Sequence, residues 1–169
     1  FYVVVAIPHR KVKQYQRNGI KYQLVCNFKE NLGRCFMHKI EHIGVAVKDL
    51  EASNALFEQL LGVAPYKQEA VVSEGVTTSF FKSGPNKVEL LQATNSDSPI
   101  AKFLDKKGEG IHHIAFSVED IVSEIARLKK EGFTVLNETP KKGADNMLVA
   151  FLHPKTTNGV LVELCQKMT

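Results

Sequence analysis

The chain has 169 residues, of which 44% are hydrophobic and 24% are charged, and its formal net charge is +4. This length fits one domain or two small half-domains that share a core, and no apolar run is long enough to span a bilayer. Residues 1–36 contain seven Lys and Arg but one Glu, whereas the rest of the chain contains fifteen Lys and Arg and seventeen Asp and Glu. The body of the chain is therefore slightly acidic, which argues against a nucleic-acid-binding protein.

The first 36 residues differ in character from the rest. They contain no Ser or Thr and have no counterpart further along the chain, while Met37 directly precedes the first repeated segment. A mitochondrial presequence is also basic, but it is rich in Ser. We therefore expect residues 1–36 to be a leader or upstream segment outside the fold, with no role in the chemistry, and residues 37–169 to form the domain.

Cysteine usage indicates the compartment. Cys26 and Cys35 lie in the leader, which leaves Cys165 as the only cysteine of the body. Without a disulfide framework the domain fits a reducing compartment. We expect a cytoplasmic location, ahead of the mitochondrial matrix.

An internal repeat organises the body. Residues 42–50 recur in similar form as residues 113–121, at an offset of 71 positions, and a helical pattern follows each copy. His, Ile, Val and Asp are identical at four of these nine positions, and Leu50 answers to Ile121. Alternating apolar residues predict strands at 40–47, 71–81, 86–92, 111–118, 133–136, 147–152 and 160–164. Helical spacing with N-caps at Asp49, Ser98 and Asp120 predicts helices at 50–61, 99–107 and 121–131. The pattern indicates two βαβββ modules, about 37–95 and 110–167, joined by a linker helix at about 98–108 and related by a pseudo-twofold axis.

The repeat also pairs four polar residues. His42 and His113 occupy the same position in the first strand of each module, and Glu89 and Glu163 lie inside the apolar last strands. Small residues, such as Gly44 beside His42, share the face of each histidine, so this face can line a cavity.

Two imidazoles and two carboxylates suit a divalent cobalt, nickel, zinc, manganese or iron ion. A carboxylate inside an apolar strand is costly to bury unless it is paired or bound to metal. Taken singly, each Glu could lie on a solvated face and each His could be a hydrogen-bonded core residue. Because the repeat places all four in matching positions, the sequence favours a metal site.

Other polar residues give weaker signals. His112 should point to the face opposite His113, as a packed or supporting imidazole. His153 and Lys155 lie in the loop before the last strand, where they could meet a phosphate-bearing substrate, although solvated turn residues are common there. Cys165 has no partner that would make it a nucleophile, and the sequence contains no Gly-rich loop for a nucleotide cofactor.

The body resembles the vicinal oxygen chelate superfamily, which includes glyoxalase I and extradiol dioxygenases, and within it the methylmalonyl-CoA epimerases. The resemblance covers about residues 37–167 and rests on residues 42–47, 97–104, 108–116, 151–155 and 159–164. It implies an α+β fold in which the two modules form a cupped eight-stranded mixed sheet around one metal ion. The implied ligands are His42, Glu89, His113 and Glu163, with cobalt expected first and zinc, manganese, nickel or iron as alternatives.

The resemblance also implies a reaction. (R)- and (S)-methylmalonyl-CoA would interconvert by loss of the α proton through a metal-stabilised enolate, with Glu163 as one base and Glu89 as the other. Thr78 stands where some epimerases place a Glu that is not a ligand, so it is expected to contact the substrate and cannot act as a base. The implied partners are an acyl-CoA thioester and a second copy of the chain in a homodimer, with no nucleic acid and no membrane.

Two other functions are compatible with these residues. A lactoylglutathione lyase would use the same metal and proton abstraction on a glutathione hemithioacetal. A non-enzymatic module of the same fold would sequester a small ligand without metal, although the presence of both His and both Glu residues argues against it.

Overall fold

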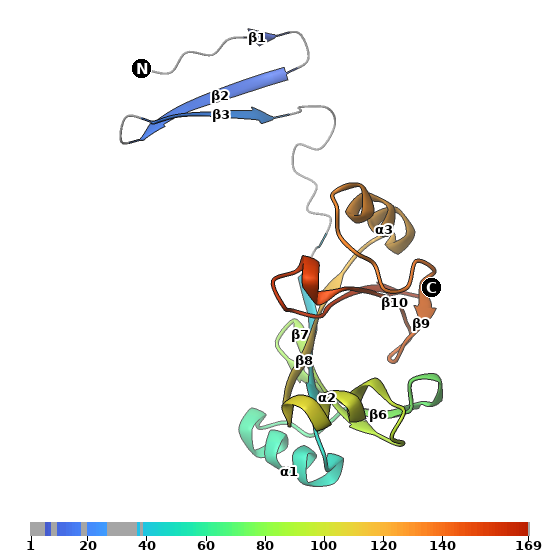
Figure 1. Ribbon diagram of the computed structural model, residues 1–169. Coiled ribbons are helices and arrows are strands. Elements are labelled where there is room, and N and C mark those ends of the chain that lie inside the picture. Colours follow the sequence, from blue (N-terminus) through green and yellow to red (C-terminus); the bar gives the residue numbers. More distant parts are fainter. Residues whose placement is uncertain (1–5, 8–9, 18–19, 27–36, 38, 169) are drawn as a thin grey trace. The chain divides into compact units, whose positions relative to one another are not determined.

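The computed structural model describes residues 6–7, 10–17, 20–26, 37 and 39–168, and the chain divides into two compact units, Phe1–Cys35 and Phe36–Thr169 (Figure 1). The first unit contains an antiparallel sheet of β1 (Ala6–Ile7), β2 (Arg10–Arg17) and β3 (Ile20–Cys26), in that order. The sequence patterns did not predict these strands. That residues 1–36 have no role in the chemistry stays a prediction.

The second unit contains the repeat. Its strands are β4 (Lys39–Ala46), β5 (Lys67–Val71), β6 (Val76–Ser83), β7 (Asn86–Ala93), β8 (Gly110–Ser117), β9 (Lys141–Lys142), β10 (Met147–Leu152) and β11 (Val162–Lys167). Its α-helices are α1 (Leu50–Leu61), α2 (Pro99–Lys107) and α3 (Ile121–Lys130). Within the described residues, no helix is long and apolar enough to cross a membrane.

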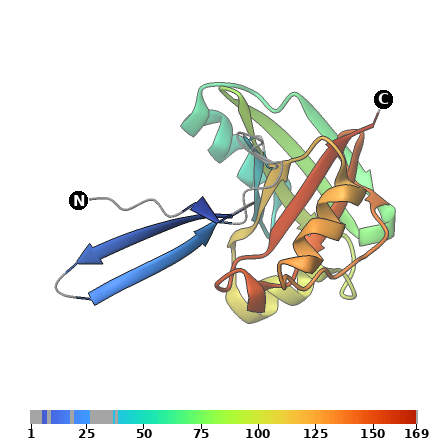
Figure 2. The same ribbon diagram turned by 90° about the horizontal axis from the view of Figure 1, so that it is seen from above.

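All eight strands join one curled sheet in the order β5-β6-β7-β4-β8-β11-β10-β9 (Figure 2). The central pair β4–β8 is antiparallel, each of these strands has a parallel neighbour, β7 or β11, and the outer pairs are antiparallel. Exchanging the modules reproduces the same order, with β4, β7, β6, β5 answering to β8, β11, β10, β9. The predicted α+β fold of two pseudo-twofold modules is confirmed.

The helices begin where the capping residues predict. Asp49 accepts a hydrogen bond from the Ala52 N–H at 3.0 Å, and Asp120 accepts one from Val122 at the same distance, which satisfies N–H groups that have no partner within the helix. Gly62 ends α1 in the left-handed conformation, at φ 70°, which glycine adopts without steric cost.

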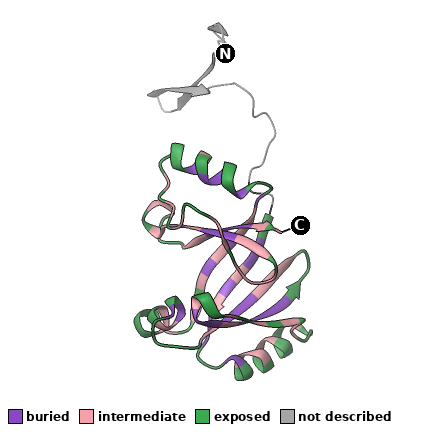
Figure 3. Ribbon diagram, turned by 90° about the vertical axis from the view of Figure 1, so that its right-hand side faces the viewer, coloured by how far each residue is buried: buried purple, intermediate pink, exposed green. Residues whose placement is uncertain are grey.

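The apolar core lies between the sheet and the helices. In module two, Ile121, Ile125 and Leu128 of α3 pack with Leu152 and Leu164 of the sheet. In module one, Leu50 of α1 packs with Val47, Phe81 and Leu90. Figure 3 shows the buried residues along the strands and the exposed residues on the outer sides of the helices. Because Leu90 and Leu164 directly follow Glu89 and Glu163, the glutamates point to the other face of the sheet, away from the helices.

Two predicted strands are wrong in detail. The run 71–81 is interrupted by a short 3-10 turn, Val72–Glu74, and by Gly75 at φ 62°. The strand expected at 133–136 is reduced to a single bridge between Val135 and Leu152. The backbone still pairs with the end of β10, because Leu136 N donates to Phe151 O and His153 N donates to Thr134 O, both at 2.8 Å. One residue further on, the Asn137 side chain takes over: it accepts from Phe151 N at 2.8 Å and donates to Val149 O at 3.2 Å.

Candidate metal centre

The strand register places the four predicted ligands on one face of the sheet: His42 of β4, Glu89 of β7, His113 of β8 and Glu163 of β11. Gly44 lies opposite both Glu89 and His113, and Ala115 lies opposite both His42 and Glu163. Side chains of directly opposite residues project to the same face. Each module therefore contributes one imidazole from a central strand and one carboxylate from the flanking strand, and all four side chains lie on the same face of the sheet.

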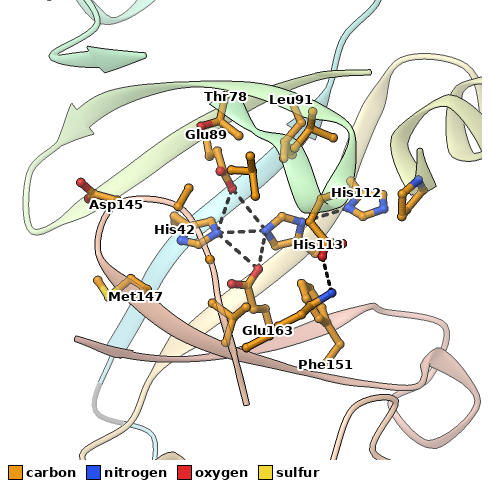
Figure 4. Close-up of a pocket in the computed structure, with 18 of the residues that line it drawn as sticks. His42, Thr78, Glu89, Leu91, His112, His113, Asp145, Met147, Phe151 and Glu163 are labelled. Atoms are coloured by element: carbon orange, nitrogen blue, oxygen red, sulfur yellow. Dashed lines mark hydrogen bonds and ion pairs between the residues drawn. The ribbon is translucent and has the colours of Figure 1, made fainter. Parts of the chain in front are cut away.

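The four side chains converge on one another (Figure 4). The two histidine Nε2 atoms are 2.9 Å apart. His42 Nε2 lies 3.1 Å from Glu89 Oε2 and 3.7 Å from Glu163 Oε2, and the corresponding distances from His113 Nε2 are 3.6 and 2.9 Å. All four residues are at most 5% exposed. The arrangement is that of a donor set facing a common centre, and His42, His113 and Glu163 form a group that could hold a metal ion.

Gly44 provides the space for this convergence. A Cβ atom at Gly44 would lie 2.2 Å from Cε1 of His113, a distance that real Cβ contacts essentially never show. The imidazole of His113 therefore occupies the volume that any larger residue at position 44 would fill. The small residue that the sequence places at position 44 therefore leaves room for the imidazole of His113.

Each histidine has a second partner at Nδ1, supplied by the residue that precedes it. His42 Nδ1 lies 2.6 Å from Glu41 Oε2, and His113 Nδ1 lies 3.0 Å from His112 Nδ1. Strict alternation along a strand would turn the side chains of Glu41 and His112 to the opposite face of the sheet from His42 and His113. The sequence analysis predicted that face for His112, and this prediction of the face is wrong, because His112 contacts His113 and lines the cavity. The β4–β8 register shifts at both places, between Ile40 and His42 on β4 and opposite His112 on β8, and such bulges redirect side chains.

In this cluster, the charges and hydrogen bonds of neighbouring residues shift the pKa values more than burial does. Burial alone would raise the pKa of Glu163, but the charges and hydrogen bonds of His113 and His42 lower the pKa of Glu163 well below its usual value. Burial would lower the pKa of His113, yet the neighbouring Glu163 and Glu89 raise it to about 9. The same contacts lower the pKa of Glu89 and raise that of His42. A divalent ion that binds these nitrogens would therefore displace protons from them.

A cavity of about 320 Å³ opens onto the cluster. Its walls are mainly apolar and include Phe80, Leu91, Met147 and Phe151, several of which are visible in Figure 4. Thr78 also lines the cavity; it is 1% exposed, and its hydroxyl group donates to Glu69 O at 3.4 Å. The space is suited to a small ligand with an apolar portion and a few oxygens directed at the cluster.

The weaker candidates lie elsewhere or are chemically inactive. His153 caps a 3-10 turn, where its Nδ1 accepts from the Lys155 N–H at 3.0 Å, and neither residue is among the described residues that line the cavity. Their contact with a substrate stays a prediction. Cys165 donates its thiol hydrogen to Glu163 Oε1 at 3.2 Å, and burial together with the charge of Glu163 raises its pKa, which makes it a poor nucleophile.

Comparison with known proteins agrees with this geometry. The sequence profile of the Glyoxalase/Bleomycin resistance protein/Dioxygenase superfamily matches residues 41–151. The chain is 44% identical to the ethylmalonyl-CoA/methylmalonyl-CoA epimerase of Cereibacter sphaeroides, over 76% of this chain and 97% of the relative. It is 42% identical to the mitochondrial methylmalonyl-CoA epimerase of Homo sapiens, over 80% of this chain and 75% of the relative.

A solved structure gives the same result at the level of the fold. A variant of the Streptomyces coelicolor methylmalonyl-CoA epimerase in complex with 2-nitronate-propionyl-CoA superposes with a TM-score of 0.76 at 34% identity, covering 79% of this chain and 96% of that one. The matched residues 41–151 include His42, Glu89 and His113 and end before Glu163. The chain belongs to the Glyoxalase/Bleomycin resistance protein/Dioxygenase superfamily.

Proposed function

We propose that this chain is a metal-dependent epimerase that interconverts (R)- and (S)-methylmalonyl-CoA. The observation that carries the proposal is the convergence of His42, Glu89, His113 and Glu163 at an apolar cavity, in a chain whose relatives are named for this reaction. The cytoplasmic location and the homodimer stay predictions.

The donor set fits a divalent ion. Nitrogen and oxygen ligands lie about 2.0–2.2 Å from such an ion, so neighbouring ligand atoms are about 3–3.5 Å apart. The nitrogen–oxygen distances of 2.9 to 3.7 Å match this spacing. The two carboxylates balance the charge of a dication, and the mixture of imidazole and carboxylate suits a divalent transition-metal ion. The family resemblance implies cobalt first, with zinc, manganese, nickel or iron as alternatives.

The two glutamates are placed to move the proton. When bound, a divalent ion supplies Lewis-acid stabilisation of the negative charge that develops as the α proton leaves. Glu89 is carried by β7 and Glu163 by β11, on opposite sides of the central strand pair. A substrate carbon between them would lose its proton to the ionised Glu163 carboxylate and receive one on the other face from Glu89 in its protonated form. The enzyme would be reset when Glu163 releases its proton to solvent and Glu89 takes one up.

The assignment of Glu89 as second base has its own test. Glu89→Gln keeps an oxygen that can bind metal but removes the base, so epimerisation should fall about 100-fold or more, while proton exchange from the face served by Glu163 persists. Stopped assays with each separate epimer in heavy water measure both quantities. Glu138→Gln is the control, because Glu138 is 68% exposed and pairs with Lys129, and it is not among the described residues that line the cavity. Undiminished epimerisation by a metal-loaded Glu89→Gln protein would remove Glu89 from this role.

The function itself is tested by removing and restoring the metal. Chelated protein should be inactive, and added cobalt should restore turnover of methylmalonyl-CoA but not of methylglyoxal with glutathione. Turnover of the glutathione hemithioacetal alone would point to a lactoylglutathione lyase. Tight binding of a small ligand by a protein that holds no metal and turns over neither substrate would instead indicate the sequestering module.

A further inference from the structure

The repeat extends to the partners of the histidines, and there the two modules differ. Glu41 and His112 are separated by the same 71 positions as His42 and His113. Each lies at an irregularity of the β4–β8 register and contacts Nδ1 of the histidine that comes after it. Module one thus presents a carboxylate at this position, whereas module two presents an imidazole.

The Glu41 side chain is buried, and both of its carboxylate oxygens have partners. It is 4% exposed, its Oε2 accepts from His42 Nδ1 at 2.6 Å, and its Oε1 pairs with Lys87 Nζ. Lys87 also pairs with Asp145 Oδ2 at 2.8 Å. Both carboxylate oxygens are therefore engaged, and a buried negative charge is matched by a cation, which removes the usual penalty of burying it alone.

We propose that Glu41 is a positioning residue for the metal centre: it fixes His42 in the tautomer with the proton on Nδ1 and thereby presents an unprotonated Nε2 to the ion. This rests on the metal centre of the proposed function. An imidazole can bind metal only through an unprotonated nitrogen, and a carboxylate on the other nitrogen sets the tautomer and raises the basicity of the ligand. Glu41 itself faces Nδ1, away from the Nε2 side on which the other donors gather.

Metal affinity of the purified, metal-free protein tests the proposal without reference to turnover. Glu41→Gln should weaken zinc binding about 10- to 100-fold in a competition titration, and Glu41→Asp, which restores the carboxylate, should recover most of the loss. The matched control is Glu124→Gln. Glu124 is also 4% exposed and accepts from Arg127 at 2.9 Å, but it lies on α3, so zinc affinity should stay within about twofold of the wild type.

A measurement on the wild-type protein covers the case in which Glu41→Gln fails to fold. In zinc-loaded protein with 15N-labelled histidine, NMR should show His42 protonated at Nδ1 and bound through Nε2. The opposite tautomer, or unchanged zinc affinity in folded Glu41→Gln, would overturn the role of Glu41 while leaving the metal centre intact. Failure of the wild-type protein to bind zinc, cobalt or manganese would overturn the metal centre and this inference together.

Discussion

At the scale of a single residue, Gly44 leaves just enough space for the imidazole of His113. Gly44→Ala places a methyl group where the imidazole of His113 lies, so His113 must move away from the other donors. Because a displacement of about 1 Å can cost about 100-fold in rate, we expect a folded protein with activity and metal affinity reduced on that order. Gly62→Ala is the control: its added Cβ meets nothing within 4 Å but is strained at φ 70°, so stability should fall while affinity holds. Wild-type affinity in Gly44→Ala would contradict this steric role.

The same scale shows what the sequence could reveal about the site. His42, His113, Glu89 and Glu163 are marked by the repeat, because two copies of one pattern place a chemical group at the same point twice. Glu41 and His112 are also 71 positions apart, but the repeat does not mark their role, because the two residues differ in chemistry and a period of two assigns both to the opposite face. Their roles arise from the register shifts between β4 and β8, and a bulge depends on pairing between strands that are distant in the sequence.

At the scale of elements, the turn between β9 and β10 connects the two modules across the cavity. Asp145 in this turn accepts from the Tyr66 hydroxyl at 3.0 Å and pairs with Lys67 at 3.3 Å and Lys87 at 2.8 Å. Its own N–H donates to Glu69 Oε2 at 3.0 Å. Four groups of module one thus hold a turn of module two that also lines the cavity.

Asp145→Asn tests the strength of this connection. Asn tolerates the left-handed conformation of residue 145, at φ 52°, so the change removes mainly the charge, and the free energy of unfolding at pH 7 should fall by about 1 kcal/mol. Burial opposes ionisation, but Lys87, Tyr66 and Lys67 lower the pKa of Asp145 below its usual value. The contribution is therefore present above the unfolded-state pKa and is lost as the pH falls through the folded-state pKa.

Urea unfolding at pH 7 and in acid, below the usual aspartate range, measures this difference. The gap between the wild type and Asp145→Asn should narrow in acid. Glu138→Gln provides the control, because Glu138 is 68% exposed and its pair with Lys129 should contribute little. An equal gap at both pH values would show that the charge of Asp145 is not what stabilises the turn.

Elements with local signals were predicted well, and those set by distant contacts were not. The starts of α1, α2 and α3 follow from their capping residues. The strand at 133–136 is only a short bridge because its backbone pairs with the end of β10 alone, and beyond it the Asn137 side chain and β9 pair with the rest of that edge. No local sequence pattern predicts which groups pair with this edge of β10.

At the scale of the whole molecule, the site exists only where the two modules meet. His42 and Glu89 come from module one, His113 and Glu163 from module two, and the β4–β8 pair brings them together. Neither module alone holds more than one imidazole and one carboxylate of the set. The four side chains are therefore brought together only when the two modules pack as a pseudo-twofold pair.

The most direct measurement of the proposed epimerase reaction follows the α proton itself. Metal-loaded protein is incubated with one epimer of methylmalonyl-CoA in heavy water, and deuterium and configuration at the carbon between the two carbonyl groups are followed with time. We predict incorporation of deuterium together with scrambling of configuration, both abolished by chelation. No incorporation by protein that demonstrably holds its metal would contradict the proposed reaction.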